Sequence, residues 1–184
     1  MSRPDTDSPV TLESVVLPNL DAAYRLARWL AGNQQDAEDI VQEASLRAIR
    51  YFRTFSGGNG RAWFLRIVRN TCYSWRGDKP QAPVDEFDEE QHSNVRDAMN
   101  PETLLLHAAD VALVKRAMND LPDRFRELLV LRELEGLTYQ ELADVLAIPI
   151  GTVMSGLSRA RHALHGALTR QLGAREQPRH AAAV

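Results

Sequence analysis

The pattern of apolar positions is sharpest between residues 137 and 161, where helical repeats stand on either side of a proline. Thr138 precedes the first repeat and Glu141 follows three residues later, which is the spacing of a helix capping box. Pro149 interrupts the repeat, so we expect the chain to turn before a second helix. Ala143 is small where the helices would cross, and four apolar side chains fill the shared core: Leu142, Leu146, Ile148 and Val153. Two short helices in this order predict a helix-turn-helix, whose second helix enters the major groove of DNA.

Helical periodicity also dominates the rest of the chain, and we find no convincing strand and no internal repeat. The expected helices are 21–31, 36–52, 61–76, 102–119 and 122–135. Gly136 is placed to end the last of them. The pattern therefore predicts an all-α protein.

Residues 77–101 interrupt the helical pattern with prolines and a run of acidic side chains, which is typical of a solvated linker. We therefore expect two small helical domains joined by a flexible acidic linker, the second domain containing the helix-turn-helix. The predicted divisions are 12–76 for the first domain, 77–103 for the linker, 104–172 for the second domain and 173–184 for a frayed tail.

The net charge of −3 is compatible with DNA binding once it is divided along the chain. Residues 77–102 hold eight acidic and two basic residues, a net −6, which leaves +3 for the remainder. Residues 150–172 contain three arginines, Arg159, Arg161 and Arg170, and no acidic residue. The predicted DNA-reading helix is thus locally basic.

Composition bounds the remaining classes of function. The 184 residues are 44% hydrophobic, and no apolar run is long enough to cross a membrane or to form a secretion signal, so we expect a cytoplasmic protein. A single cysteine, Cys72, excludes a disulfide framework, and His162 and His165 have no further ligands nearby, so we expect no metal. Residues 56–60 lack the ending of a phosphate-binding loop. No catalytic constellation stands out, so we predict neither an enzyme nor a cofactor.

The expected helix 61–76 has two contrasting faces. Phe64, Ile67, Val68, Thr71 and Trp75 lie on one face, whereas Arg66, Arg69, Tyr73 and Arg76 lie on another. Arginines contact phosphates and aromatic rings stack on exposed bases, so the second face suits single-stranded DNA. The alternative is a surface helix with solvated arginines and with Trp63 and Trp75 in the core.

The expected helix 36–52 opens with acidic residues, which favourably meet the helix dipole. Glu38, Asp39, Gln42 and Glu43 continue along one exposed strip, which would suit a basic partner.

Three segments, in this order, resemble motifs of bacterial sigma factors of the extracytoplasmic-function class, the small members of the sigma-70 family. They are residues 36–43, 61–70 and 151–161. The resemblance covers about residues 12–76 and 104–170, which is nearly everything except the linker and the ends.

The resemblance implies a transcription initiation factor that binds core RNA polymerase, directs it to −35 and −10 promoter elements and promotes strand opening. The implied partners are the clamp helices of the largest polymerase subunit, the polymerase flap region, promoter DNA and an anti-sigma factor. The implied polymerase-binding residues are Asp36, Glu38, Asp39, Gln42 and Glu43. The implied −10 residues are Asn59, Arg61, Trp63, Arg66, Arg69 and Asn70. The implied −35 residues are Arg132, Thr152, Met154, Ser155, Ser158, Arg159 and Arg161.

The chain departs from this family pattern at three positions in the helix-turn-helix. Met154 and Gly156 stand where many relatives place Lys or Arg, which we expect to weaken phosphate affinity. Ala147 occupies a turn position where relatives often have Gly. The −35 sequence therefore does not transfer from better-known members.

Two other functions remain open at this point. A helix-turn-helix regulator that binds duplex DNA alone, as a dimer, explains residues 122–170 but leaves the arginine-rich helix and the acidic strip without a role. A polymerase-binding adaptor that never melts promoters explains the strip. Initiation in vitro separates both from a sigma factor.

Overall fold

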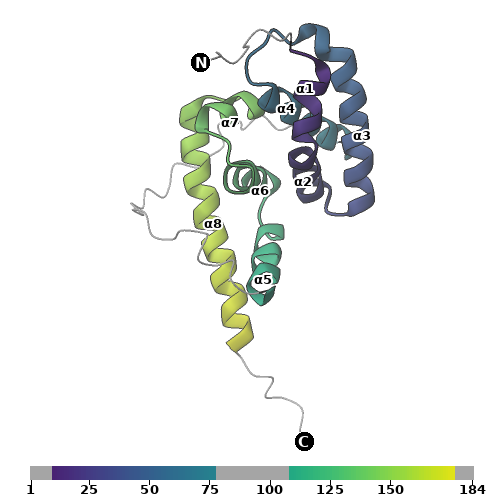
Figure 1. Ribbon diagram of the computed structural model, residues 1–184. Coiled ribbons are helices and arrows are strands. Elements are labelled where there is room, and N and C mark those ends of the chain that lie inside the picture. Colours follow the sequence, from purple (N-terminus) through teal and green to yellow (C-terminus); the bar gives the residue numbers. More distant parts are fainter. Residues whose placement is uncertain (1–9, 78–107, 177–184) are drawn as a thin grey trace, which may run out of the picture.

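The computed structural model describes residues 10–77 and 108–176, and these fold as helices, with no strand among them (Figure 1). The first half contains α1 (Leu12–Val16), η1 (Leu17–Asn19), α2 (Leu20–Ala31), α3 (Gln34–Tyr51), η2 (Phe52–Thr54) and α4 (Gly60–Trp75). The second half contains α5 (Ala108–Asn119), α6 (Asp123–Leu129), η4 (Val130–Leu134), α7 (Tyr139–Leu146) and α8 (Ile150–Glu176). The all-α prediction is confirmed. The expected linker lies almost wholly outside the described residues.

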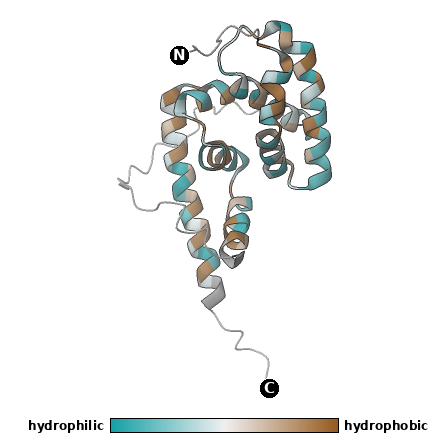
Figure 2. Cartoon of the chain, in the orientation of Figure 1, coloured by the Kyte–Doolittle hydropathy of each residue, from teal (hydrophilic) through white to brown (hydrophobic). Residues whose placement is uncertain are grey.

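The first domain packs α2, α3 and α4 around a core rich in alanine. Ala37, Ala44 and Ala48 on α3 are fully buried, so that helix approaches its neighbours closely, while its outer face is largely hydrophilic (Figure 2). Gly32, at a φ of +85°, ends α2 in the left-handed conformation that glycine favours. Gly60 starts α4 against α1, since a Cβ there would lie 2.9 Å from Cγ1 of Val15.

The second domain contains the predicted helix-turn-helix. The Thr138 hydroxyl accepts from the Glu141 N–H at 3.2 Å, and the Glu141 carboxylate accepts from the Thr138 N–H at 2.6 Å, so the capping box is confirmed. Ala147 then adopts a left-handed conformation, with φ +57°, and α7 and α8 meet at a bend of 100°. That angle lies within the range of helix-turn-helix motifs.

The expected helix 122–135 is confirmed in its extent, whereas the expected length of the last helix was wrong. Residues 122–135 form α6 followed by the π-helical turn η4, which ends before Gly136 at φ +66°. The second helix of the motif is not short, because α8 runs to Glu176 and therefore into the expected tail. A second small core explains the length: Ala167 and Leu168 of α8 are buried against Leu113 and Ala117 of α5.

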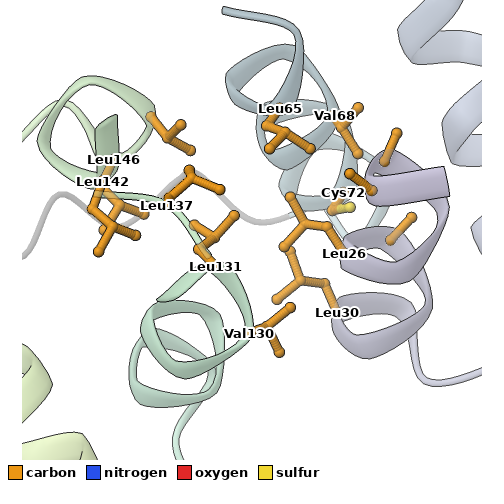
Figure 3. Packing of buried hydrophobic residues seen from close by; sticks show 14 of the residues in the cluster. Leu26, Leu30, Leu65, Val68, Cys72, Val130, Leu131, Leu137, Leu142 and Leu146 are labelled. Carbon is orange, nitrogen blue, oxygen red and sulfur yellow. The ribbon is translucent and has the colours of Figure 1, made fainter. Parts of the chain in front are cut away.

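The two domains share one hydrophobic core, an arrangement that the sequence left open. Figure 3 shows Leu26, Leu30 and Leu65 of the first domain facing Val130 and Leu131 of the second. Leu137, Leu142 and Leu146 extend the same cluster into the helix-turn-helix. The polar ends of this interface hold several of the candidate functional residues.

In the part of the chain that the structure describes, no single helix has the length and apolar content to cross a membrane. Residues 139–146 and 150–173 have a sufficient length and apolar content only when the two helices are counted together. They are separated by a bend of 100°.

Candidate nucleic-acid interface

The polar strip on α3 lies on one helix face, as expected. Glu38 and Gln42 are exposed, whereas Asp36, Asp39 and Glu43 are half-buried. Asn33 caps the helix by accepting from the Asp36 N–H at 2.9 Å, and Gln34 donates to Glu38 at 2.8 Å. Glu43 pairs with Arg47 at 2.8 Å. The strip therefore begins at a capped helix end.

An apolar patch continues this strip toward the end of α3, and sequence reasoning missed it. Leu46 is 46% exposed, Ile49 57% and Tyr51 54%. Helical spacing from Asp39 and Gln42 leads to Leu46 and Ile49, away from the buried alanines, so the periodicity contained the signal. Exposed apolar side chains bordered by polar ones mark contact surfaces.

The loop before α4 is held by a cap and an aromatic cluster. Asn59 accepts from the Ala62 N–H at 3.0 Å. The half-buried Trp63 ring lies 5.1 Å from the ring of Phe55 and 6.1 Å from that of Phe52. Trp75 was expected in the core under the surface-helix alternative, and that expectation was wrong: it is the last residue of α4 and is 48% exposed.

The arginine face of α4 does not face solvent as a whole. Arg61 donates to the main-chain oxygen of Glu135 at 2.7 Å and to its carboxylate at 3.1 Å. Arg69, 5% exposed, donates to Glu127 of α6 at 2.5 Å. Arg66 is exposed and lines an open cleft against the turn between α7 and α8, and Asn70 is half-buried. Two of these residues, Arg61 and Arg69, therefore already bind carboxylates of the second domain.

Glu127 lies at the centre of the buried polar contacts. Burial raises the pKa of its carboxyl, because loss of water outweighs the attraction of Arg69 and the hydrogen bond from the Tyr73 hydroxyl at 3.3 Å. Burial likewise raises the pKa of Tyr73, so its phenol stays a proton donor.

The outer face of the helix-turn-helix presents most of the expected −35 residues. Ser155, Ser158 and Arg161 are exposed, and Met154 is 52% exposed. Thr152 is half-buried. Arg159, also half-buried, donates to the Ser155 carbonyl at 3.2 Å and to its hydroxyl at 3.1 Å. These contacts fix the arginine along the helix.

Two positions of the second domain make contacts within the protein that the sequence did not indicate. Arg132 donates to the Leu137 carbonyl at 2.6 Å and its guanidinium lies 4.8 Å from the centre of the Tyr139 ring, so it braces the start of α7. Gly156 is buried, and a Cβ there would lie 2.9 Å from Cδ1 of Leu128. Position 156 therefore faces α6, and the effect of a missing charge there on phosphate binding stays a prediction.

Comparisons with known proteins agree with this geometry. Residues 15–79 match the family described as sigma-70 region 2, and residues 112–164 match sigma-70 region 4. The RNA polymerase sigma-H factor of Pseudomonas aeruginosa is 36% identical over 143 residues, which cover 73% of this chain and 74% of that relative. The ECF sigma-E factor of Escherichia coli strain K12, of the extracytoplasmic-function (ECF) class, is 35% identical over 137 residues, which cover 70% of this chain and 72% of that relative. The chain belongs to the ECF sigma factors.

Other relatives extend the comparison. SigE of Mycolicibacterium smegmatis is 31% identical over 86% of this sigma factor, although the match spans 62% of that relative's length. Among solved structures, RpoE of Bartonella quintana, crystallised with the anti-sigma factor NepR, superposes with a TM-score of 0.62 at 31% identity. That likeness covers 84% of this chain and 94% of RpoE.

Helices α1–α4 are thus region 2 of the sigma factor, and α5–α8 contain region 4. Sigma factors are transcription initiation factors and are not themselves catalysts. Among the described residues, no three His, Cys, Asp or Glu side chains gather in a way that would hold a metal ion.

Proposed function

We propose that the sigma factor docks on core RNA polymerase, at the clamp helices of its largest subunit, through the outer face of α3. The polar strip consists of Asp36, Glu38, Asp39, Gln42 and Glu43. Leu46 and Ile49 extend it with apolar area. The observation that carries the proposal is this combined face, since charged residues set orientation while exposed apolar side chains supply contact energy.

Promoter DNA binds the other two surfaces. The −35 element is read by the outer face of α8, through Thr152, Met154, Ser155, Ser158, Arg159 and Arg161, with Arg132 near the phosphates. The −10 element is read by the loop before α4 and by α4 itself, through Asn59, Arg61, Trp63, Arg66, Arg69 and Asn70. Capture of a flipped base there promotes strand opening.

A protein of the anti-sigma class restrains the free chain and covers its polymerase-binding surfaces. The crystallised complex of the Bartonella relative with NepR supports this partner.

A competition experiment tests the docking surface. Labelled wild-type chain is bound to purified core polymerase, and unlabelled Glu38→Lys or Leu46→Asp variants compete for it. We expect each variant to compete about tenfold or more weakly, because each places an unsuitable charge in the contact. Asp21→Lys, on the exposed face of α2, makes the same charge change as Glu38→Lys outside the strip. Equal competition by Glu38→Lys, Leu46→Asp and Asp21→Lys would place the docking surface elsewhere.

A further inference from the structure

The contact between region 2 and region 4 contains charged pairs as well as the shared apolar core. Arg25 of α2 binds both carboxylate oxygens of Glu135, at 2.7 and 2.8 Å, and Arg61 binds the same carboxylate at 3.1 Å. The Glu135 side chain is fully buried, so this carboxylate depends on the two arginines for its solvation.

A second group of contacts repeats the arrangement along α4. Arg69 and Glu127 form an ion pair whose side chains are 6% and 3% exposed. Asn59 donates to the Glu141 carboxylate at 2.5 Å. Arg76 pairs with Asp123 at 2.6 Å.

These pairs all have the same polarity. Region 2 supplies the N–H donors, and region 4 supplies the carboxylates. Three of the donors, Asn59, Arg61 and Arg69, belong to the surface proposed to bind the −10 strand. A guanidinium donates to a carboxylate or to a phosphate in the same fork geometry, so the two anions compete for it.

We propose that Glu127, Glu135 and Glu141 of region 4 act as internal substitutes for promoter phosphates, which hold the free chain closed and mask its −10 surface. This inference rests on the proposed function of α4. The mask is selective, because Met154, Ser155 and Ser158 on α8 stay exposed in the closed chain. A partner that separates the regions, such as core polymerase, exposes the −10 surface as it binds.

The energetics of these ion pairs suit a contact that opens and closes reversibly. Buried ion pairs add little net stability, because desolvation offsets their attraction, yet removing one partner of such a pair is costly. The apparent DNA affinity of the free chain is its open-state affinity multiplied by the open fraction. Weakening the contact should therefore raise the affinity for single-stranded DNA.

Arg25 offers a sharp test, because it belongs to the contact but not to the proposed DNA surface. Arg25→Gln removes a positive charge, which by itself lowers DNA affinity. Arg28→Gln, on the exposed face of the same helix, removes the same charge, and the hydrogen bond found for Arg28 stays within region 2. Glu135→Gln is the complementary change in region 4. Asp120→Asn is its matched control, because Asp120 bonds Gln171 within that region.

The probe is a fluorescent single-stranded DNA of randomised sequence, and binding to the full chain is followed by anisotropy at low salt. Closure is read separately by energy transfer between dyes on Gln35→Cys and His162→Cys, two exposed positions in the two regions. Circular dichroism verifies that each variant is folded.

We expect Arg25→Gln and Glu135→Gln to lower the energy transfer and to tighten DNA binding about fivefold, whereas the two controls do neither. Opening without any gain in DNA affinity would overturn the masking role. Weak energy transfer in the labelled chain without further substitutions would show that the two regions are already apart, and would overturn the closed state. Core-dependent initiation by wild type, measured in parallel, distinguishes failure of the mask from failure of the proposed function.

Discussion

At the scale of single residues, Ala147 holds the turn of the helix-turn-helix in a conformation that suits glycine. Its φ of +57° brings the Cβ close to the backbone, which costs an L residue about 1–2 kcal/mol. Relatives in the family often have glycine at this position. The structure shows that the chain keeps the left-handed turn and accepts the strain.

Replacing Ala147 with glycine should therefore leave the free energy of unfolding unchanged or raise it by up to about 1 kcal/mol, since relief of strain offsets the larger entropy of the unfolded chain. Ala112→Gly, at an exposed position inside α5, should lower it by about 1 kcal/mol. Urea titrations of both variants provide the measurement. If Ala147→Gly lowered the free energy of unfolding as much as Ala112→Gly does, the turn at Ala147 would not be strained.

Cys72 shows how burial controls reactivity. Its side chain is 1% exposed, and loss of water raises the pKa of the thiol from the ordinary 9.0 to about 12. Because the thiolate is the reactive form, its population near neutral pH falls about a thousandfold. We expect a thiol reagent at mildly alkaline pH to modify the folded chain extremely slowly and the urea-unfolded chain rapidly. Similar rates in both states would show that Cys72 is accessible.

At the scale of elements, helix starts were predictable because their signals are local. Thr138 and Glu141 lie within one turn, and Pro149 acts on its own neighbours. The length of α8 was not predictable in this way, because its second half is supported by α5, more than forty residues earlier in the chain. Arg69 gives the same lesson: its helix face was foreseen, but its partner Glu127 is 58 residues away.

The capping box should contribute to the stability of region 4. Thr138→Ala removes the acceptor of the Glu141 N–H and should lower the free energy of unfolding by about 1 kcal/mol. Thr169→Ala is the control, because that hydroxyl only bonds the carbonyl one turn before it within α8. Thermal unfolding compares the two, and equal losses would argue against a specific cap.

The same element predicts a dependence on pH. The backbone N–H of Thr138 holds the pKa of the Glu141 carboxyl below its ordinary 4.5. A lowered pKa in the folded state means that the stabilisation is present above the ordinary value and is lost as pH falls through the lowered one. The stability difference between wild type and Glu141→Gln should therefore shrink as the pH falls below the ordinary 4.5 and through the lowered pKa. A stability difference that does not change with pH would show that the ionised Glu141 carboxylate does not stabilise the helix start.

At the scale of the whole molecule, the two regions are joined by a continuous core and by charged pairs of one polarity. Each region was recognisable from its own periodicity and motifs. The contact between the regions was not predictable. The pairs Arg25–Glu135 and Arg69–Glu127 join residues far apart in the chain, and no periodic pattern in the sequence relates them. The faces proposed to bind polymerase and the −35 element remain outside this contact, while much of the proposed −10 face lies within it.

The most direct measurement is transcription in vitro with purified core polymerase and a pooled genomic promoter library, with the transcript 5′ ends sequenced. We predict starts downstream of a shared −35 and −10 pattern, strongly reduced by Arg66→Ala and retained by Arg28→Ala. Arg66 suits this test because it is exposed on the proposed −10 surface. Core binding without initiation would contradict a sigma function and favour an adaptor. The absence of both would favour a DNA-binding regulator that acts alone.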